Sequence, residues 1–157
     1  MSGGSCAGSR IEGGCPVFEI FEHTADLGLR VRAPSLERLC EDAAAGLMQI
    51  IAGDVAQIRP DEPETFELSG RRPDYLLFDW LNELLYVFGS RRMLFSRFEV
   101  APGVEERGLR ATAFGERYDP ARHTLAHEVK AITYHGLTVK RPGDSGGQWE
   151  ATVIVDI

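Results

Sequence analysis

The chain has 157 residues, of which 43% are hydrophobic and 26% charged, and 24 acidic against 17 basic side chains give a formal net charge of −7. This length suffices for one compact domain, and the composition is that of a globular protein rather than of a disordered chain or an integral membrane protein. The negative charge disfavours nonspecific attraction to nucleic-acid phosphates, so we expect any function on RNA to act through a partner protein.

The beginning of the chain differs from the rest. Residues 1–15 are small and polar without hydrophobic periodicity, so we expect a flexible leader there and a single domain over residues 16–157. No apolar stretch resembles a secretory signal or reaches the roughly 20 residues that span a bilayer, which favours a cytoplasmic protein. Cys6, Cys15 and Cys40 suit neither a disulfide framework nor a zinc pair.

The first elements after the leader are two short strands and a helix. VFEIF at 17–21 and GLRVRA at 28–33 alternate apolar and polar residues, as half-buried strands do, and HTAD forms the turn between them. From Ser35 onward, apolar residues recur every three or four positions, which predicts a helix with Ser35 as its N-cap and Gly53 at its end.

The second half of the chain alternates again. ETFELSG at 64–70 is a predicted strand, and residues 71–90 form a predicted helix that begins at Pro73 or Asp74 and ends at Gly89. Further strands are predicted at 95–101, 108–119, 124–141 and 148–157. This order indicates an α+β fold, in which two main helices cover a mainly antiparallel sheet.

GDSGG at 143–147 spells the run that surrounds the nucleophilic serine of chymotrypsin-like proteases. Those enzymes need two packed barrels to place the histidine and aspartate of the triad, and this chain is too short for them. The proline and glycines around Ser145 instead predict a turn between two antiparallel strands.

Two acidic residues are candidate metal ligands. The apolar run WEATVIVDI ends with Asp156 followed by the α-carboxylate of Ile157, and like charges this close raise each other's pKa or recruit a cation. Asp26 is the natural third carboxylate if the last strand inserts beside it. Such an oxygen-only site suits Ca²⁺ or Mg²⁺ and not zinc. The alternative is a turn aspartate bonded to backbone amides and a terminal acid in water.

The remaining ionisable candidates give weaker signals. His23, His123, His127 and His135 lack paired metal-ligand spacing, and a structural role is favoured for His23 over a chemical one. Lys130 lies among apolar residues, where it pairs with the acids if partly buried and otherwise protects a strand edge. The chain has neither a GxSxG elbow nor a phosphate-binding GxxxxGK[ST] loop.

Three segments together resemble the archease family. FEHTADLGLRVRAPSLERLCEDAAAGLMQII is similar to the opening of archease, EVKAITYHGLTV to its penultimate strand, and WEATVIVDI to its final strand. The resemblance runs from about Phe18 to Ile157 and excludes the leader. HTAD, KAITYH and a terminal DI are far more specific together than any one alone.

The resemblance implies a helper protein and not an enzyme. Archease promotes the RtcB-type RNA ligase of tRNA splicing and RNA repair, which joins a 3′-phosphate or 2′,3′-cyclic phosphate to a 5′-hydroxyl. It speeds guanylylation of the ligase's active-site histidine and allows repeated turnover. The family's metal site, often holding Ca²⁺ and with Mg²⁺ or Mn²⁺ as possible occupants, corresponds here to Asp26, Asp156 and the backbone of Ile157.

Lys130 and His23 are further candidates for activating the partner. In this hypothesis an acidic tip, neutralised in part by a cation, docks near the ligase's nucleotide site and favours the conformation competent for guanylyl transfer. Two alternatives stay open: a free-standing metal-dependent phosphoester hydrolase, and a chaperone-like binding module whose metal is structural.

Overall fold

The computed structural model describes residues 17–23, 26–143 and 147–157. Within these residues, two helices and seven strands follow one another, together with two short 3-10 turns. The strands are β1 (Phe18–His23), β2 (Asp26–Ala33), β3 (Glu62–Leu68), β4 (Met93–Pro102), β5 (Leu109–Arg117), β6 (Ala131–Lys140) and β7 (Trp149–Asp156), and the helices are α1 (Leu36–Ala52) and α2 (Pro73–Arg91). The predicted leader and the predicted turn at Ser145 lie outside the described residues.

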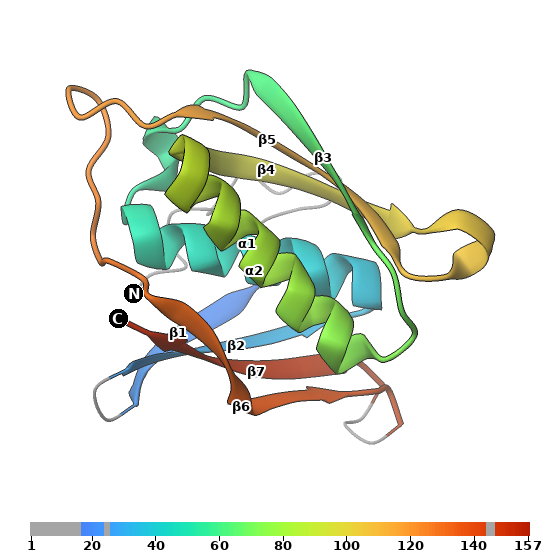
Figure 1. Ribbon diagram of the computed structural model, residues 1–157. Helices are drawn as coiled ribbons and strands as arrows, with labels where there is room; N and C mark the ends of the chain where they lie inside the picture. The colour runs from blue at the N-terminus through green and yellow to red at the C-terminus, as the bar shows by residue number, and fades with distance from the viewer. Residues whose placement is uncertain (1–16, 24–25, 144–146) are drawn as a thin grey trace.

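All the described strand pairs are antiparallel, and they form two sheets. The larger sheet has the order β1-β2-β7-β6 and the smaller one the order β3-β5-β4. Both helices lie between the two sheets (Figure 1). The predicted α+β fold is therefore confirmed, with its strands divided between two sheets instead of one.

Helix α1 has the predicted ends. The Ser35 hydroxyl accepts a hydrogen bond from the Arg38 N–H at 3.1 Å, and the Gly53 N–H donates to the Gln49 carbonyl at 2.8 Å. Gly53 has a φ of 82°, which a glycine adopts without steric cost. In the middle of the helix, Gly46 lets α1 approach the Leu29 side chain of β2, because a Cβ at Gly46 would lie 2.4 Å from it.

Helix α2 extends beyond the predicted end. The prediction that Gly89 ends the helix is wrong, because Gly89 is helical and Arg92, at a φ of 58°, is the left-handed cap. The Arg92 N–H donates to the Phe88 carbonyl at 2.9 Å, and its guanidinium lies 4.5 Å from the centre of the Phe88 ring. One glycine costs a helix only about 1 kcal/mol, too little to end one anchored by a buried apolar stripe.

The strand predicted at 124–141 is shorter in the structure. It begins only at Ala131, and residues 124–130 instead cross the carboxyl end of α1. The Ala126 N–H donates to the Ile51 carbonyl at 2.7 Å, and the Thr124 hydroxyl donates to the Ala52 carbonyl at 3.3 Å. The segment thus satisfies carbonyls that the last turn of a helix leaves unpaired.

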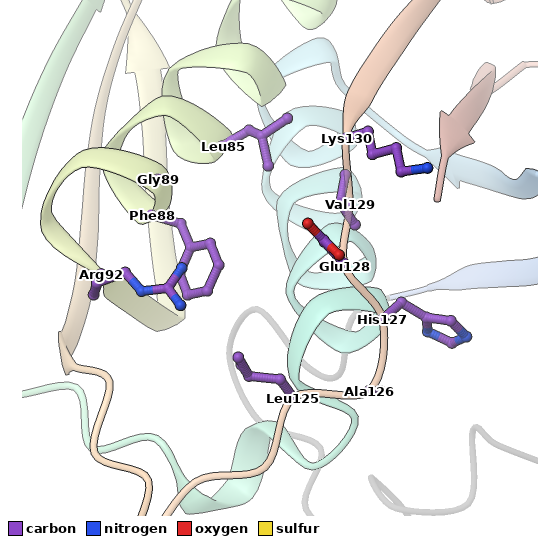
Figure 2. Close-up of a pocket in the computed structure, with 10 residues that line it drawn as sticks. All are labelled: Leu85, Phe88, Gly89, Arg92, Leu125, Ala126, His127, Glu128, Val129 and Lys130. Atoms are coloured by element: carbon purple, nitrogen blue, oxygen red, sulfur yellow. The ribbon is translucent and has the colours of Figure 1, made fainter.

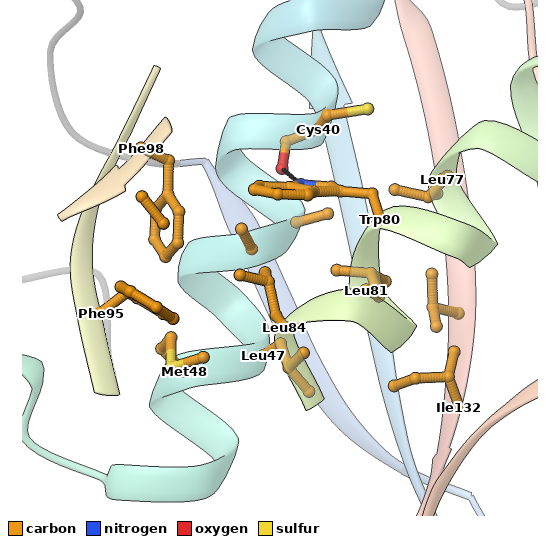
Figure 3. Packing of buried hydrophobic residues seen from close by; sticks show 14 of the residues in the cluster. Cys40, Leu47, Met48, Leu77, Trp80, Leu81, Leu84, Phe95, Phe98 and Ile132 are labelled. Carbon is orange, nitrogen blue, oxygen red and sulfur yellow. Dashed lines mark hydrogen bonds between the residues drawn. The ribbon is translucent and has the colours of Figure 1, made fainter. Parts of the chain in front are cut away.

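Trp80 is the centre of the hydrophobic core (Figure 3). Its indole N–H donates to the Cys40 carbonyl at 2.9 Å, which satisfies the one polar group of this buried ring. Its ring packs edge-on against Phe66 and Phe98. Burial raises the pKa of the Cys40 thiol, so this cysteine is an inert core residue.

Candidate metal and partner-binding site

Asp26 and Asp156 lie at directly opposite positions where β2 pairs with β7. Alternate residues of these strands point into the core, among them Leu29 and Val153, which are fully buried. Both aspartates have the opposite parity and therefore lie on the outer face of the larger sheet, where each is partly exposed. Directly opposed residues share a face with their Cβ atoms about 4.5–5.5 Å apart.

The strand register places Asp26 and Asp156 in one row of opposed residues that crosses all four strands of the larger sheet. β1 places His23 opposite Asp26, and β6 places Ala131 opposite Asp156. For His23 the structure describes only the strand position, so the interpretation of its side chain stays a prediction. Asp26 was predicted in a turn, but it is the first residue of β2. The strand pairing, and not a loop, therefore fixes its position.

Lys130 lies directly beside Asp156. Its backbone N–H donates to the Asp156 carbonyl at 2.8 Å. Figure 2 shows its side chain pointing away from Phe88 and toward the end of β7. Lys130 is exposed and forms no ion pair with a residue that the structure describes. The backbone contact thus fixes an exposed lysine next to Asp156 in space.

The paired aspartates differ from the other acids on this face. Glu19 pairs with Arg30 at 2.9 Å, and Glu150 pairs with Arg32 at 3.1 Å. Within the described ranges, neither Asp26 nor Asp156 forms an ion pair or a side-chain hydrogen bond. Two adjacent carboxylates without such partners favour binding of a cation.

The donor set at this point consists of oxygen atoms. Among residues 17–23, 26–143 and 147–157, no group of three or more His, Cys, Asp and Glu side chains could hold a metal ion. Two aspartates alone are fewer ligands than the six to eight oxygens that Ca²⁺ takes. Ile157 follows Asp156 directly and is packed against the core, so its backbone is the next oxygen donor along the chain. The residues fit a hard cation whose coordination is completed by water or a partner.

A hollow of about 620 Å³ lies beside Lys130 (Figure 2). Its walls come from the end of α2, including Leu85 and Phe88, and from residues 125–130. The sequence gives no sign of this hollow, because the pattern over residues 124–141 predicts a strand there. The left-handed position at Arg92, which shapes one wall, has no signal in the sequence, since arginine rarely adopts it.

His123 and His127 have structural roles in the described region. His123 is buried, accepts a hydrogen bond from the Asp119 N–H at Nδ1, and lies 2.7 Å from the Glu116 carboxylate through Nε2. Nδ1 of His127 lies 3.0 Å from the Ile50 carbonyl. These contacts fix the loop after β5.

No described helix is long and apolar enough to cross a bilayer.

Several known proteins are similar to this chain in sequence and in fold. The archease of Methanopyrus kandleri is 41% identical over 142 residues, which cover 89% of this chain and 99% of that protein. The archease of Pyrococcus abyssi is 37% identical over 142 residues, with coverages of 89% and 98%.

Two solved structures are similar. The solution structure of Methanobacterium thermoautotrophicum protein 1598 has a TM-score of 0.74 at 31% identity, covering 91% of this chain and all (100%) of that one. The crystal structure of a Thermotoga maritima archease, described as a possible chaperone, has a TM-score of 0.60 at 22% identity, covering 88% and 96%. At that identity the second likeness supports the fold alone.

A family model agrees with these likenesses over almost the whole described chain. The model of the Archease protein family (MTH1598/TM1083) matches residues 18–157. The matched range contains both paired aspartates, both helices and both sheets. The chain belongs to the archease family.

Proposed function

We propose that this protein is a non-catalytic activator of an RtcB-type RNA ligase in the cytoplasm. It promotes guanylylation and repeated turnover of the ligase in tRNA splicing and RNA repair. Membership of the archease family supports this proposal, and the observation that carries it is the direct pairing of Asp26 with Asp156 on the outer face of the sheet.

The paired aspartates are the proposed working surface. Asp26 and Asp156, with the backbone of Ile157, would hold a divalent cation, Ca²⁺ first and Mg²⁺ or Mn²⁺ as alternatives. A bound cation would supply positive charge that relieves the repulsion between the carboxylates. The antiparallel pairing of β2 and β7 keeps both side chains in place, so this tip needs little ordering when a partner binds.

Activation of this kind requires a difference in affinity between two states of the partner. A helper that binds the guanylylation-competent state more tightly shifts the ligase toward it, and tenfold tighter binding corresponds to about 1.4 kcal/mol. Lys130, beside Asp156, is a candidate contact for the same partner, and His23, opposite Asp26 on β1, is the second candidate. The net charge of −7 supports contact with RNA only through the ligase.

The test is RNA joining by a purified RtcB-type ligase present in limiting amount. The substrates carry a 2′,3′-cyclic phosphate and a 5′-hydroxyl, and the reactions run with the ligase alone, with both proteins, and with this protein alone. The proposal predicts many more turnovers per ligase with both proteins and no reaction without ligase. Equal turnover with and without this protein contradicts it. Phosphoester hydrolysis by this protein alone would support the hydrolase alternative instead.

A further inference from the structure

Helix α2 has an exposed face with a regular pattern. Tyr75, Asp79, Glu83 and Tyr86 are spaced by four, four and three residues, so they lie along one side of the helix. All four are exposed, and Tyr75 and Tyr86 are 47% and 70% exposed. Figure 1 shows α2 at the front of the molecule.

One end of this face is ordered by neighbouring side chains. The Tyr75 ring stacks on Tyr134 of β6 with 5.4 Å between ring centres, and the Arg72 guanidinium lies 4.3 Å from the Tyr75 ring centre. The Tyr134 hydroxyl donates to Asp74 at 3.0 Å, and Arg72 donates to the same carboxylate at 2.7 Å. Tyr75 is thus held in place, which lowers the entropy cost of a contact there.

The centre of the face is acidic. Asp79 and Glu83 form no ion pair within the described ranges. The acids that do form ion pairs there have arginine partners. Four residues of helix rise about 6 Å, so the two carboxylates match two cations at a similar separation. Lysine or arginine side chains at positions i and i+4 of a second helix have this spacing.

We propose that this face of α2 docks a basic helix of a partner protein. Two cations of that helix meet Asp79 and Glu83, and its apolar side chains contact Tyr75 and Tyr86 at the two ends. Tyrosines around desolvated charge pairs are typical of the residues that dominate binding energy at interfaces. Nucleic acid does not fit, because the centre of the face is negative and repels phosphates.

The inference names a contact for the partner in the proposed function and rests on it. The measurement is direct binding to immobilised RtcB-type ligase at low and high salt. The variant is Asp79→Asn with Glu83→Gln. The matched control is Asp61→Asn with Glu62→Gln, which removes the same charge from exposed acids at the start of β3. Tyr86→Ala tests the apolar end without touching the core.

The expected result is about tenfold weaker binding by the α2 variant, which corresponds to about 1.4 kcal/mol. Its salt dependence should also fall, while the control binds like the wild type and a large excess of the variant restores full ligase stimulation. Wild-type affinity in the α2 variant would overturn the docking face alone. No binding by the wild-type chain would overturn it together with the proposed function.

A second copy of this chain is the other possible occupant of the face. Sedimentation of the isolated chain, wild type and Tyr86→Ala, distinguishes it. If the wild type and Tyr86→Ala both sediment as monomers, the result supports docking of a partner's helix on this face. A wild-type dimer that dissociates in Tyr86→Ala would show that the face is a self-association surface and overturn the inference.

Discussion

Asp26, the first residue of β2, and Asp156, the last residue of β7, face each other directly across the two central strands of the larger sheet. Like charges in directly opposed positions destabilise a sheet. Lys130 donates its backbone N–H to Asp156 at the same point, and no described arginine or lysine pairs with either carboxylate. This arrangement should lower the stability of the fold unless the two acids share a cation. The stability of the protein with and without a cation therefore tests the pair.

Asp156→Asn should therefore stabilise the protein when calcium is absent and make it less stable than the wild type when calcium is present. In chelator the variant is expected to be more stable than the wild type by about 0.2–1 kcal/mol, because the repulsion between opposed carboxylates is gone. In excess CaCl₂ the wild type should gain stability and the variant should not, since the proposed site would bind the ion only in the native state with both acids present. Thermal unfolding with and without calcium measures both effects.

The control for that experiment is Glu150→Gln, on the same strand and the same face. Glu150 pairs with Arg32 at the surface, so its loss is expected to change stability by less than about 1 kcal/mol and to leave the calcium response intact. A calcium response that survives in Asp156→Asn would exclude the paired aspartates as the ion site.

Glu116 should give the protein a stability that is lost in acid. Desolvation raises the pKa of this carboxyl, but hydrogen bonds from the Arg59 N–H, Arg122 and His123 outweigh it and lower the pKa from 4.5 to about 2. A carboxyl with a depressed pKa in the folded state stabilises above its unfolded pKa, and this stability is lost as pH falls from about 4.5 to 2.

Glu116→Gln should remove that part of the pH dependence. The variant is expected to be less stable than the wild type at pH 6, by about 1–2 kcal/mol after solvent screening, and nearly equal to it at pH 2. Urea unfolding across this range measures the difference. A constant gap at all pH values would contradict the assigned cause.

Two helical glycines should respond to alanine in opposite directions. At Gly46 a Cβ would lie 2.4 Å from Leu29, so Gly46→Ala should overpack the contact between α1 and β2 and cost about 1–3 kcal/mol. At Gly89 no atom outside its chain neighbours and its own turn of helix backbone lies within 4 Å of the added Cβ, so Gly89→Ala should stabilise α2 by about 0.5–1 kcal/mol. Chemical denaturation of the pair measures both, and stabilisation by both changes would contradict the packing of Gly46.

Local signals in the sequence sufficed for elements whose ends have local causes. Ser35 and Gly53 bound α1 as predicted, because an N-cap hydroxyl and a glycine at positive φ act within one turn. The end of α2 was mispredicted, since packing of the stripe before Phe88 overrides the weak preference of Gly89. Residues 124–130 were mispredicted because their hydrogen-bond partners on α1 are more than 70 positions away in the chain.

In the candidate site, too, features with local causes could be predicted and features with distant causes could not. Two-residue alternation along the last strand is enough to put Asp156 on the face opposite Val153 and Val155, and the observed burial agrees. The position of Asp26 opposite Asp156 required the order of strands in the sheet, which no local pattern fixes. Cation binding, the ligase partner and the roles of Lys130 and His23 stay predictions.

The most direct test of the account is ligase stimulation by Asp26→Asn and Asp156→Asn beside Glu150→Gln, with the fold of each variant verified by circular dichroism. Both aspartate variants are expected to fold and to leave the turnover of a limiting RtcB-type ligase at its unstimulated rate, while Glu150→Gln stimulates like the wild type. Full stimulation by either folded aspartate variant would contradict it.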